Sequence, residues 1–168
     1  RAWWVVWGLV SSEVVTSALP TMHPHRSGKF ESTCIHVTLP KNNSGRLKGL
    51  EGARLGVWLA HGEGMFKLPG DQSQYSIAAT YTYPEYPGNA NDSDFAAAAL
   101  ASKDGCNLAI MPHIERSLFP WNWPYYYCLK EKDEIGPWIK AFVNVWDWVK
   151  GSGGYGDTWR WIKVLDIV

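Results

Sequence analysis

Short stretches of alternating or continuous apolar residues recur along the chain, and they predict strands. They are "FESTCIHVTL" at 30–39, "RLGVWLA" at 54–60, "YSIAATYTY" at 75–83 and "CNLAIMP" at 106–112. "FAAAALAS" at 95–102 has helix propensity through its alanines, but it is short and stands between turns. We therefore prefer a pair of strands here, joined by the hairpin turn signal at 103–105.

A helix is predicted further along the chain. Pro137 suits the first helical position, and apolar residues recur from there at helical spacing up to Val149. Gly151 ends the pattern, so the predicted helix covers 137–150. The face that we expect to pack on the sheet consists of Trp138, Phe142, Trp146 and Val149.

The remaining segments are less regular. Residues 19–29 and 84–94 are rich in turn-forming residues, which predicts a loop and a series of turns. At 2–18 the pattern fits a helix or a buried strand. "GSGG" at 151–154 is typical of a flexible linker, and the residues after it form an extension of unassigned role.

The length and the charge of the chain limit the classes of protein to which it can belong. At 168 residues it is about one domain long, with zero formal net charge and a pI near 7.1. This balance indicates neither a nucleic acid nor a membrane as the partner. The apolar run at 2–10 is shorter than the roughly 20 residues that span a bilayer, and no signal-peptide cleavage site follows it closely.

Cys34, Cys106 and Cys128 are widely spaced and odd in number. They match neither a disulfide framework nor a paired-cysteine metal site, so we expect a reducing, cytoplasmic location. The sequence begins with Arg1 rather than Met, and six of its 11 tryptophans stand near the two ends. These features suggest a fragment or an altered sequence.

A histidine and a glutamate follow the predicted strand at 106–112. In "MPHIER", His113 and Glu115 are two residues apart, so their side chains can point to the same side and form a hydrogen bond. A carboxylate in this place fixes the tautomer of the imidazole and stabilises its cation, as a general base for a nucleophile requires. The spacing alone is common by chance, which favours an ordinary loop.

Other histidines are open to more than one interpretation. "HGEG" at 61–64 can form a ligand loop, because glycines allow close backbone approach, or a tight turn with solvated charges. His23 and His25 are spaced like metal ligands, but no third ligand follows suitably, so a surface loop without metal is favoured. The aromatic residues also leave two alternatives open, a non-catalytic interaction domain and a carbohydrate-binding module.

Five segments taken together resemble one family closely. They are "HRSGKFES" at 25–32, "GVWLAHGEGMF" at 56–66, "YPGNANDSD" at 86–94, "LAIMPHIERSLFPW" at 108–121 and "GPWIKAFVNVWDW" at 136–148. In this order they resemble the glutamine amidotransferase domain of phosphoribosylformylglycinamidine synthases. The resemblance covers about residues 19–148, and "AHGEG" with "MPHIER" is its most specific part.

The resemblance implies a fold and a reaction. The fold is the class I amidotransferase type of α/β domain, an open and mostly parallel sheet flanked by helices, whose N-terminal part would be missing here. A Cys–His–Glu triad forms a thioester with glutamine, and water then releases glutamate. The ammonia passes to the synthase domain of the same enzyme. There, with ATP and Mg, formylglycinamide ribonucleotide becomes formylglycinamidine ribonucleotide in purine biosynthesis.

Matched to the family motifs, His113 is the catalytic base and Glu115 its orienting partner, while His61 and Glu63 bind the substrate. No cofactor or metal is implied in this domain. We expect Glu115 to bond one ring nitrogen of His113. The other nitrogen should face an open cleft, which His61 and Glu63 also line.

The chain also departs from the family. The nucleophile motif Gly-x-Cys-x-Gly does not occur among the 168 residues. The family commonly has Asn, Pro and Gly where this chain has His25, Ala90 and Asp92. We therefore expect residues 1–150 to be a partial amidotransferase domain that is inactive alone, and 151–168 to be a linker with an extension.

Overall fold

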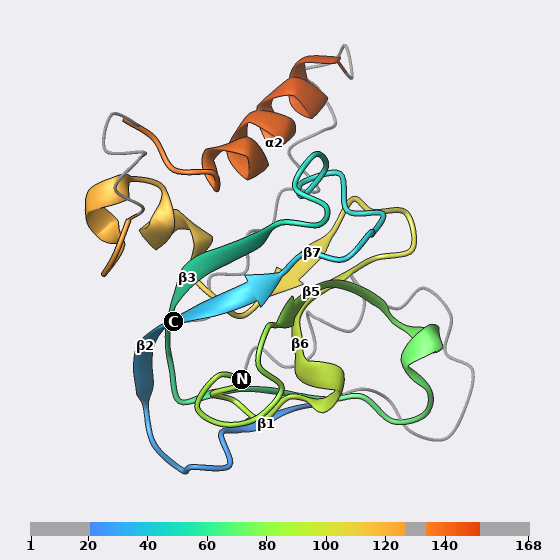
Figure 1. Cartoon of the computed structure of the whole chain (residues 1–168). Helices are drawn as coiled ribbons and strands as arrows, with labels where there is room; N and C mark the ends of the chain where they lie inside the picture. The colour runs from blue at the N-terminus through green and yellow to red at the C-terminus, as the bar shows by residue number, and fades with distance from the viewer. Residues whose placement is uncertain (1–20, 127–133, 152–168) are drawn as a thin grey trace.

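The computed structural model describes residues 21–126 and 134–151 (Figure 1). Its strands are β1 (Thr21–Pro24), β2 (Glu31–Thr38), β3 (Arg54–His61), β4 (Glu63–Lys67), β5 (Ser76–Tyr81), β6 (Ala97–Ala101) and β7 (Leu108–Ile110). Its helices are α2 (Ile139–Gly151) and the 3-10 turns η1 (Gln72–Gln74), η2 (Asp94–Ala96), η3 (Ile114–Ser117) and η4 (Pro120–Asn122). The segment 2–18 and the extension after Gly151 lie outside the described residues.

The α/β class is confirmed, but the expected mostly parallel sheet is wrong. The main sheet has the order β3-β2-β5-β6-β7, and each neighbouring pair of strands is antiparallel. Parallel neighbours need a crossover of a dozen or more residues, usually through a helix. The turn at 102–107 is too short for such a crossover, and 39–53 joins β2 to β3 through turns alone.

The alternation of the sequence explains the central strands. In β2, Ile35 and Val37 are buried while His36 between them is exposed. In β3, the buried positions Val57 and Leu59 continue in the same phase. The predicted strands at 30–39, 54–60, 75–83, 95–102 and 106–112 are therefore confirmed, as is the hairpin that joins the last two.

The loop predicted at 19–29 is partly wrong, because it contains β1. β1 pairs with β4 in a separate two-stranded antiparallel sheet, and β4 follows β3 after the single residue Gly62. Both strands are short, and Pro24 ends the first at a register shift. Each satisfies the backbone of the other, so their formation depends on the pairing more than on local propensity.

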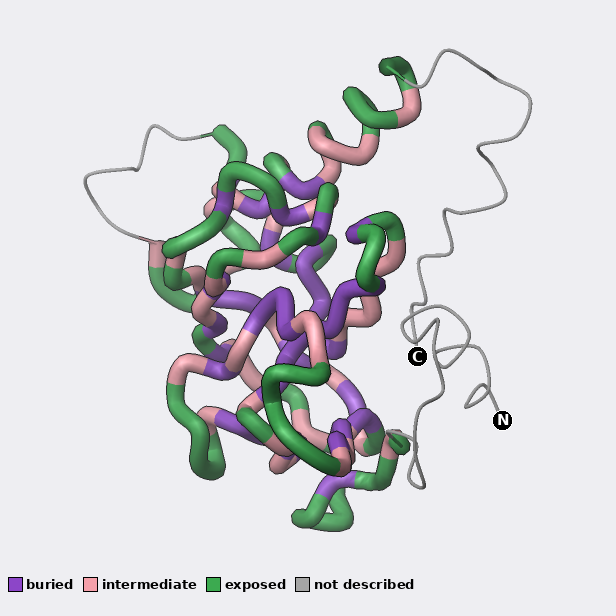
Figure 2. Tube along the Cα trace, turned by 90° about the vertical axis from the view of Figure 1, so that its right-hand side faces the viewer, coloured by how far each residue is buried: buried purple, intermediate pink, exposed green. Residues whose placement is uncertain are grey.

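The two edges of the main sheet meet. β3 and β7 are the edge strands, yet His113, just after β7, forms an isolated antiparallel bridge with Trp58 of β3. The amide of His113 donates to the carbonyl of Trp58 at 2.7 Å. The sheet is therefore curled, and β6 is buried along its whole length, which its small alanines permit (Figures 1 and 2).

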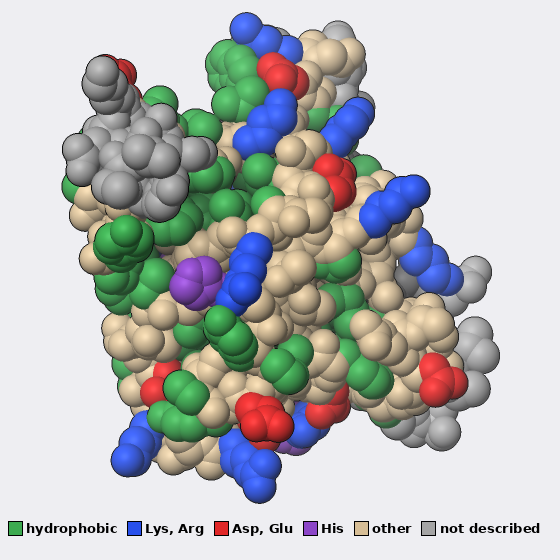
Figure 3. Space-filling view, viewed as in Figure 1, with side chains coloured by type: hydrophobic (Ala, Val, Ile, Leu, Met, Phe, Trp, Pro, Cys, Tyr) green, Lys and Arg blue, Asp and Glu red, His purple; other side chains and the backbone are tan. Residues whose placement is uncertain are grey.

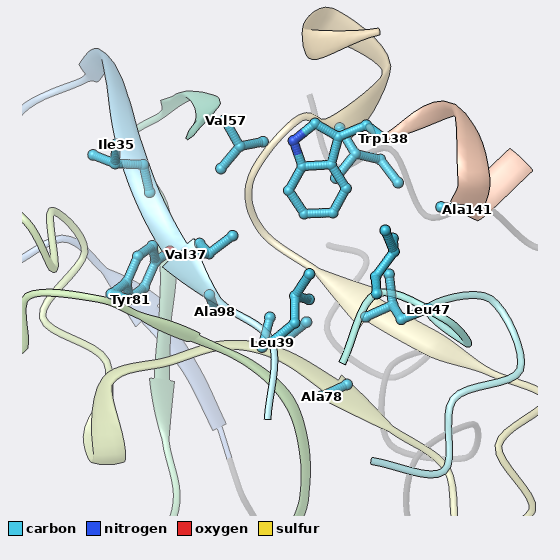
Figure 4. Close-up of a cluster of buried hydrophobic side chains, with 14 of the residues drawn as sticks. Ile35, Val37, Leu39, Leu47, Val57, Ala78, Tyr81, Ala98, Trp138 and Ala141 are labelled. Carbon is cyan, nitrogen blue, oxygen red and sulfur yellow. The ribbon is translucent and has the colours of Figure 1, made fainter. Parts of the chain in front are cut away.

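The main core lies between the curled sheet and the start of α2. Figure 4 shows Trp138 between Val57 and Leu47, with Val37 of β2 beyond them and Ile35 farther along the same strand. Burying apolar side chains of this size stabilises the fold by roughly 1.5–3 kcal/mol each. The indole Nε1 of Trp138 also donates to the carbonyl of Gly56 at 2.8 Å, so its polar atom is satisfied inside the core.

Helix α2 is confirmed, but the face predicted for it is correct only near its start. Trp138 and Ala141 are fully buried, and Phe142 packs partly buried against the core. Trp146 is 59% exposed, because the later turns extend away from the body of the molecule (Figures 1 and 2). Among the described residues, no helix is both long and apolar enough to cross a membrane.

Candidate active site

His113 and Glu115 form the pair that their spacing suggested. His113 precedes η3, and this turn brings the carboxylate back, so that Glu115 Oε1 lies 2.8 Å from His113 Nδ1. An ionised carboxylate only accepts hydrogen bonds, so Nδ1 carries the hydrogen. In the neutral imidazole the other nitrogen, Nε2, is then the basic one.

The Nε2 atom of His113 is buried, and the described part of the chain offers it no hydrogen-bond partner. His113 as a whole is 6% exposed. The expected opening onto a cleft is therefore wrong for this nitrogen. The segment is also held firmly in place, because Ser117 Oγ accepts from the amide of Trp58 at 3.2 Å.

His61 lies at the end of β3, in phase with the buried side chains of that strand. It is 6% exposed, so it is not the solvated turn residue of one interpretation of "HGEG". Burial, and then the proximity of His25 and His113, lower the pKa of His61 to about 4. Its ring is consequently neutral at neutral pH.

His25 was not predicted as part of this site. It is 3% exposed, and its Nε2 lies 2.7 Å from Nδ1 of His61, with the two rings edge to face. The amide of His25 also donates to the carbonyl of Gly62 at 3.0 Å. Burial lowers the pKa of His25, an effect that the charge of Glu31 partly opposes. The surface loop expected for this residue is wrong.

His23 and Glu63 lie at the exposed margin of the same region. His23 is exposed and pairs through Nε2 with the hydroxyl of Thr21 at 2.8 Å. Glu63 begins β4 with an exposed side chain, while its backbone raises the pKa of both His25 and His61. The structure therefore brings His61 and His113 together, and it leaves the Glu63 carboxylate at the surface.

Gly64 allows the two halves of the site to pack against each other. Its φ is +122°, and a Cβ there would lie 2.0 Å from Cε of Met111, two residues before His113. The same Cβ would lie 3.5 Å from Cε1 of His61. A side chain at this position would thus collide with the end of the Met111 side chain, in the segment that joins β7 to His113.

The segment 86–94 holds β4 in place through buried side chains. The turns predicted for this segment do not indicate that role. Asn91 is fully buried and donates from Nδ2 to the carbonyl of Gly64 at 2.9 Å. Ser93 Oγ accepts from the amide of Phe66 at 3.0 Å. These two buried side chains form hydrogen bonds with backbone groups of β4 that would otherwise have no partner. A run of Asn and Ser among turn residues is the sequence signal that could indicate them.

The described cysteines are not activated nucleophiles. Cys34 is partly buried on β2, and burial raises its pKa. Cys106 is exposed, and burial of part of its thiol, followed by the charge of Asp104, raises its pKa as well. Cys128 lies outside the described residues. Within the described segments, no cluster of three or more His, Cys, Asp or Glu side chains could hold a metal ion.

The chain is similar to proteins of one kind. The CobB/CobQ-like glutamine amidotransferase domain matches residues 5–149. The probable phosphoribosylformylglycinamidine synthase, chloroplastic/mitochondrial, of Arabidopsis thaliana is 37% identical in an alignment 161 residues long, which covers 85% of this chain and 11% of that protein. The human phosphoribosylformylglycinamidine synthase is 34% identical in an alignment 139 residues long, which covers 75% of this chain and 10% of that protein. The chain thus spans about a tenth of the length of these relatives.

A solved structure has a similar fold. It is described as the structure of PurLQS from Thermotoga maritima, and it matches with a TM-score of 0.57 at 20% sequence identity. The match covers 79% of this chain and 54% of the other chain. At this level of identity the likeness concerns the fold alone.

Proposed function

The chain belongs to the family of CobB/CobQ-like glutamine amidotransferase domains, and on this basis we propose that it takes part in releasing ammonia from glutamine. Residues 1–150 form part of the glutaminase domain, and residues 151–168 form a linker and an extension. The observation that carries the proposal is the hydrogen bond between His113 Nδ1 and Glu115 Oε1, 2.8 Å long.

In the proposed reaction His113 moves protons and Glu115 stabilises the charge. Nε2 of His113 is buried in the 168-residue chain, so the reaction requires the nucleophile segment to pack directly against it. There Nε2 takes the proton of a cysteine thiol, whose thiolate attacks the side-chain carbonyl carbon of glutamine. His113 then protonates the leaving nitrogen, and ammonia departs as a thioester forms. His113 next deprotonates a water molecule that attacks the thioester, and glutamate and the free thiol result.

The nucleophile belongs to a Gly-x-Cys-x-Gly segment that is not among these 168 residues. Without a triad nucleophile the rate falls typically by about a million-fold, so the 168 residues alone are inactive. His61 and Glu63 bind the glutamine substrate in this proposal. The buried, neutral imidazole of His61 supports that role, because it offers a hydrogen-bonding nitrogen without a charge.

The ammonia serves a synthase partner domain that amidates formylglycinamide ribonucleotide for purine biosynthesis. ATP and Mg act in that partner, and the glutaminase domain uses no cofactor of its own. The names of the relatives support this assignment. A cytoplasmic location belongs to the same proposal.

Glu115→Gln in the full-length enzyme tests the proposal. The amide keeps the size of the carboxylate but not its charge, so we expect the glutamine-dependent rate to fall by about 10²–10⁴-fold. The rate with added ammonia should persist, because the synthase site is intact. Glu85→Gln, at an exposed position on the turn before the cis peptide Tyr86–Pro87, is the control and should change neither rate. Loss of both rates in Glu115→Gln would mean that Glu115 is structural.

An exposed aromatic patch favours a second role, that of an interaction domain. Phe119 and Trp121 stack with ring centroids 4.7 Å apart, and Trp121 and Tyr125 are 74% and 73% exposed. Figure 3 shows hydrophobic side chains gathered on the left of the molecule, while the charges are scattered. If Glu115→Gln left the glutamine-dependent rate unchanged, this non-catalytic role would become the better explanation.

A further inference from the structure

The contact between His25 and His61 limits the number of protons that the two rings can hold. Nε2 of His25 and Nδ1 of His61 are 2.7 Å apart, and both side chains are buried. Two N–H groups cannot face each other at this distance, so a single hydrogen lies between the rings. While the contact persists, the pair carries at most one positive charge.

The surroundings decide where that charge resides. Glu31, which is opposite His61 in the pairing of β2 with β3, favours the cation of His25. His113 disfavours a cation on His61, and the backbone of Glu63 raises the pKa of both rings. The outer ring nitrogens, Nδ1 of His25 and Nε2 of His61, are buried and have no hydrogen-bond partner in the described part of the chain. The carboxylate of Glu115 faces His113 rather than this pair. A proton taken up by the pair therefore goes to His25.

We propose that His25 is a positioning residue that keeps His61 uncharged and in one tautomer beside His113. When His25 is protonated, its Nε2–H donates to Nδ1 of His61, and His61 must carry its own hydrogen on Nε2. A second proton on the pair would break the contact. The catalytic meaning of this arrangement depends on the proposed function, because a cation on His61 would oppose the imidazolium that forms on His113 during the reaction.

Nuclear magnetic resonance of the 168-residue chain, with ¹⁵N in the histidine rings, tests the pair directly. The ring-nitrogen shifts report the tautomer and the charge of each histidine as the pH is lowered from 8 to 4.5. We expect His61 to stay neutral and in one tautomer while at most one proton is taken up by the pair. Charged His25 and charged His61 together at pH 5.5, in the folded chain, would overturn the proposal.

His25→Gln removes the competition between two histidines for one positive charge, but it keeps a hydrogen-bonding group near the place of Nε2. The amide oxygen accepts from Nδ1–H of His61 and does not titrate, so His61 can then hold both hydrogens. We expect the titration midpoint of His61 to rise by about one unit, because the repulsion by His25 is lost while burial remains. His23→Gln, at the exposed position two residues earlier on β1, is the matched control and should leave the midpoint unchanged.

An unchanged midpoint of His61 in folded His25→Gln would refute the coupling. If this variant does not fold, the titration of the unmodified chain decides alone. In the full-length enzyme, His25→Gln should move the acidic limb of the glutamine-dependent rate to higher pH and leave the ammonia-dependent rate unaffected. If the acidic side of this pH profile does not move, the positioning role is refuted. Failure of the proposed function would appear separately, in Glu115→Gln.

Discussion

Single residues connect the two halves of the site, and Gly64 is the most constrained of them. Its φ of +122° is open only to glycine, and Met111 fills the space where a side chain would stand. We expect Gly64→Ala to lower the free energy of unfolding by about 2–4 kcal/mol, from backbone strain together with the collision. Urea denaturation followed by tryptophan fluorescence measures this change.

Gly28→Ala measures the strain of a milder positive φ without a collision. Gly28 also has a positive φ, +64°, but nothing lies within 4 Å of the position of its Cβ. This variant should cost only about 1 kcal/mol, the strain alone. Equal losses in the two variants would mean that Met111 moves aside without cost, and that Gly64 does not hold the site together through packing.

The sequence could reveal the local pair of this site but not the distant one. His113 and Glu115 are two residues apart at the end of a strand, so geometry and family motif pointed to the same contact. His25 and His61 are 36 residues apart, and their contact depends on β1 lying beside β4. A local pattern does not contain that pairing, which is why the sequence predicts a surface loop for His25.

At the scale of elements, strands with clear alternation were predictable and their arrangement was not. In β3 every second side chain is buried, from Val57 through Leu59 to His61. This alternation is visible in the sequence. The expectation of a mostly parallel sheet rests on the family resemblance alone. The short connection between β6 and β7 permits only an antiparallel pair. The lengths of the connections would have been the better guide.

Helix α2 offers a comparison between two identical side chains. Trp138, just before its first turn, is fully buried, whereas Trp146 is 59% exposed and lies under the ammonium of Lys150, 4.7 Å from the ring centroid. We expect Trp138→Ala to lower the free energy of unfolding by about 3–5 kcal/mol. Trp146→Ala should change it by no more than about 0.5 kcal/mol. Thermal unfolding monitored by circular dichroism gives both values, and equal losses would contradict the packing of Figure 4.

At the scale of the whole molecule, the curl of the sheet creates the site. The ends of β3 and β7 belong to opposite edges of the sheet, and the bridge between Trp58 and His113 brings them together. His61 and His113 meet only because of this closure. β6, a strand of alanines with one leucine, is buried along its whole length inside this curled sheet. No local pattern indicates how far a sheet closes.

The whole chain also determines which thiols can react. Only a thiolate attacks glutamine, and the pKa values of Cys34 and Cys106 are raised above their usual range by burial. We therefore expect a diazo-ketone analogue of glutamine to leave these two cysteines and Cys128 unmodified in the 168-residue chain at pH 7.5, as measured by mass spectrometry. The chain should likewise hydrolyse glutamine no faster than its His113→Ala variant.

Iodoacetamide at pH 9 is the positive control for this labelling experiment. It needs no binding site, so it should alkylate the exposed Cys106 before the partly buried Cys34. Labelling of any cysteine by the glutamine analogue in a one-to-one ratio would identify that residue as a nucleophile within these 168 residues. The proposal that the thiol partner of His113 comes from a Gly-x-Cys-x-Gly segment would then be wrong, whereas selective labelling by iodoacetamide alone supports it.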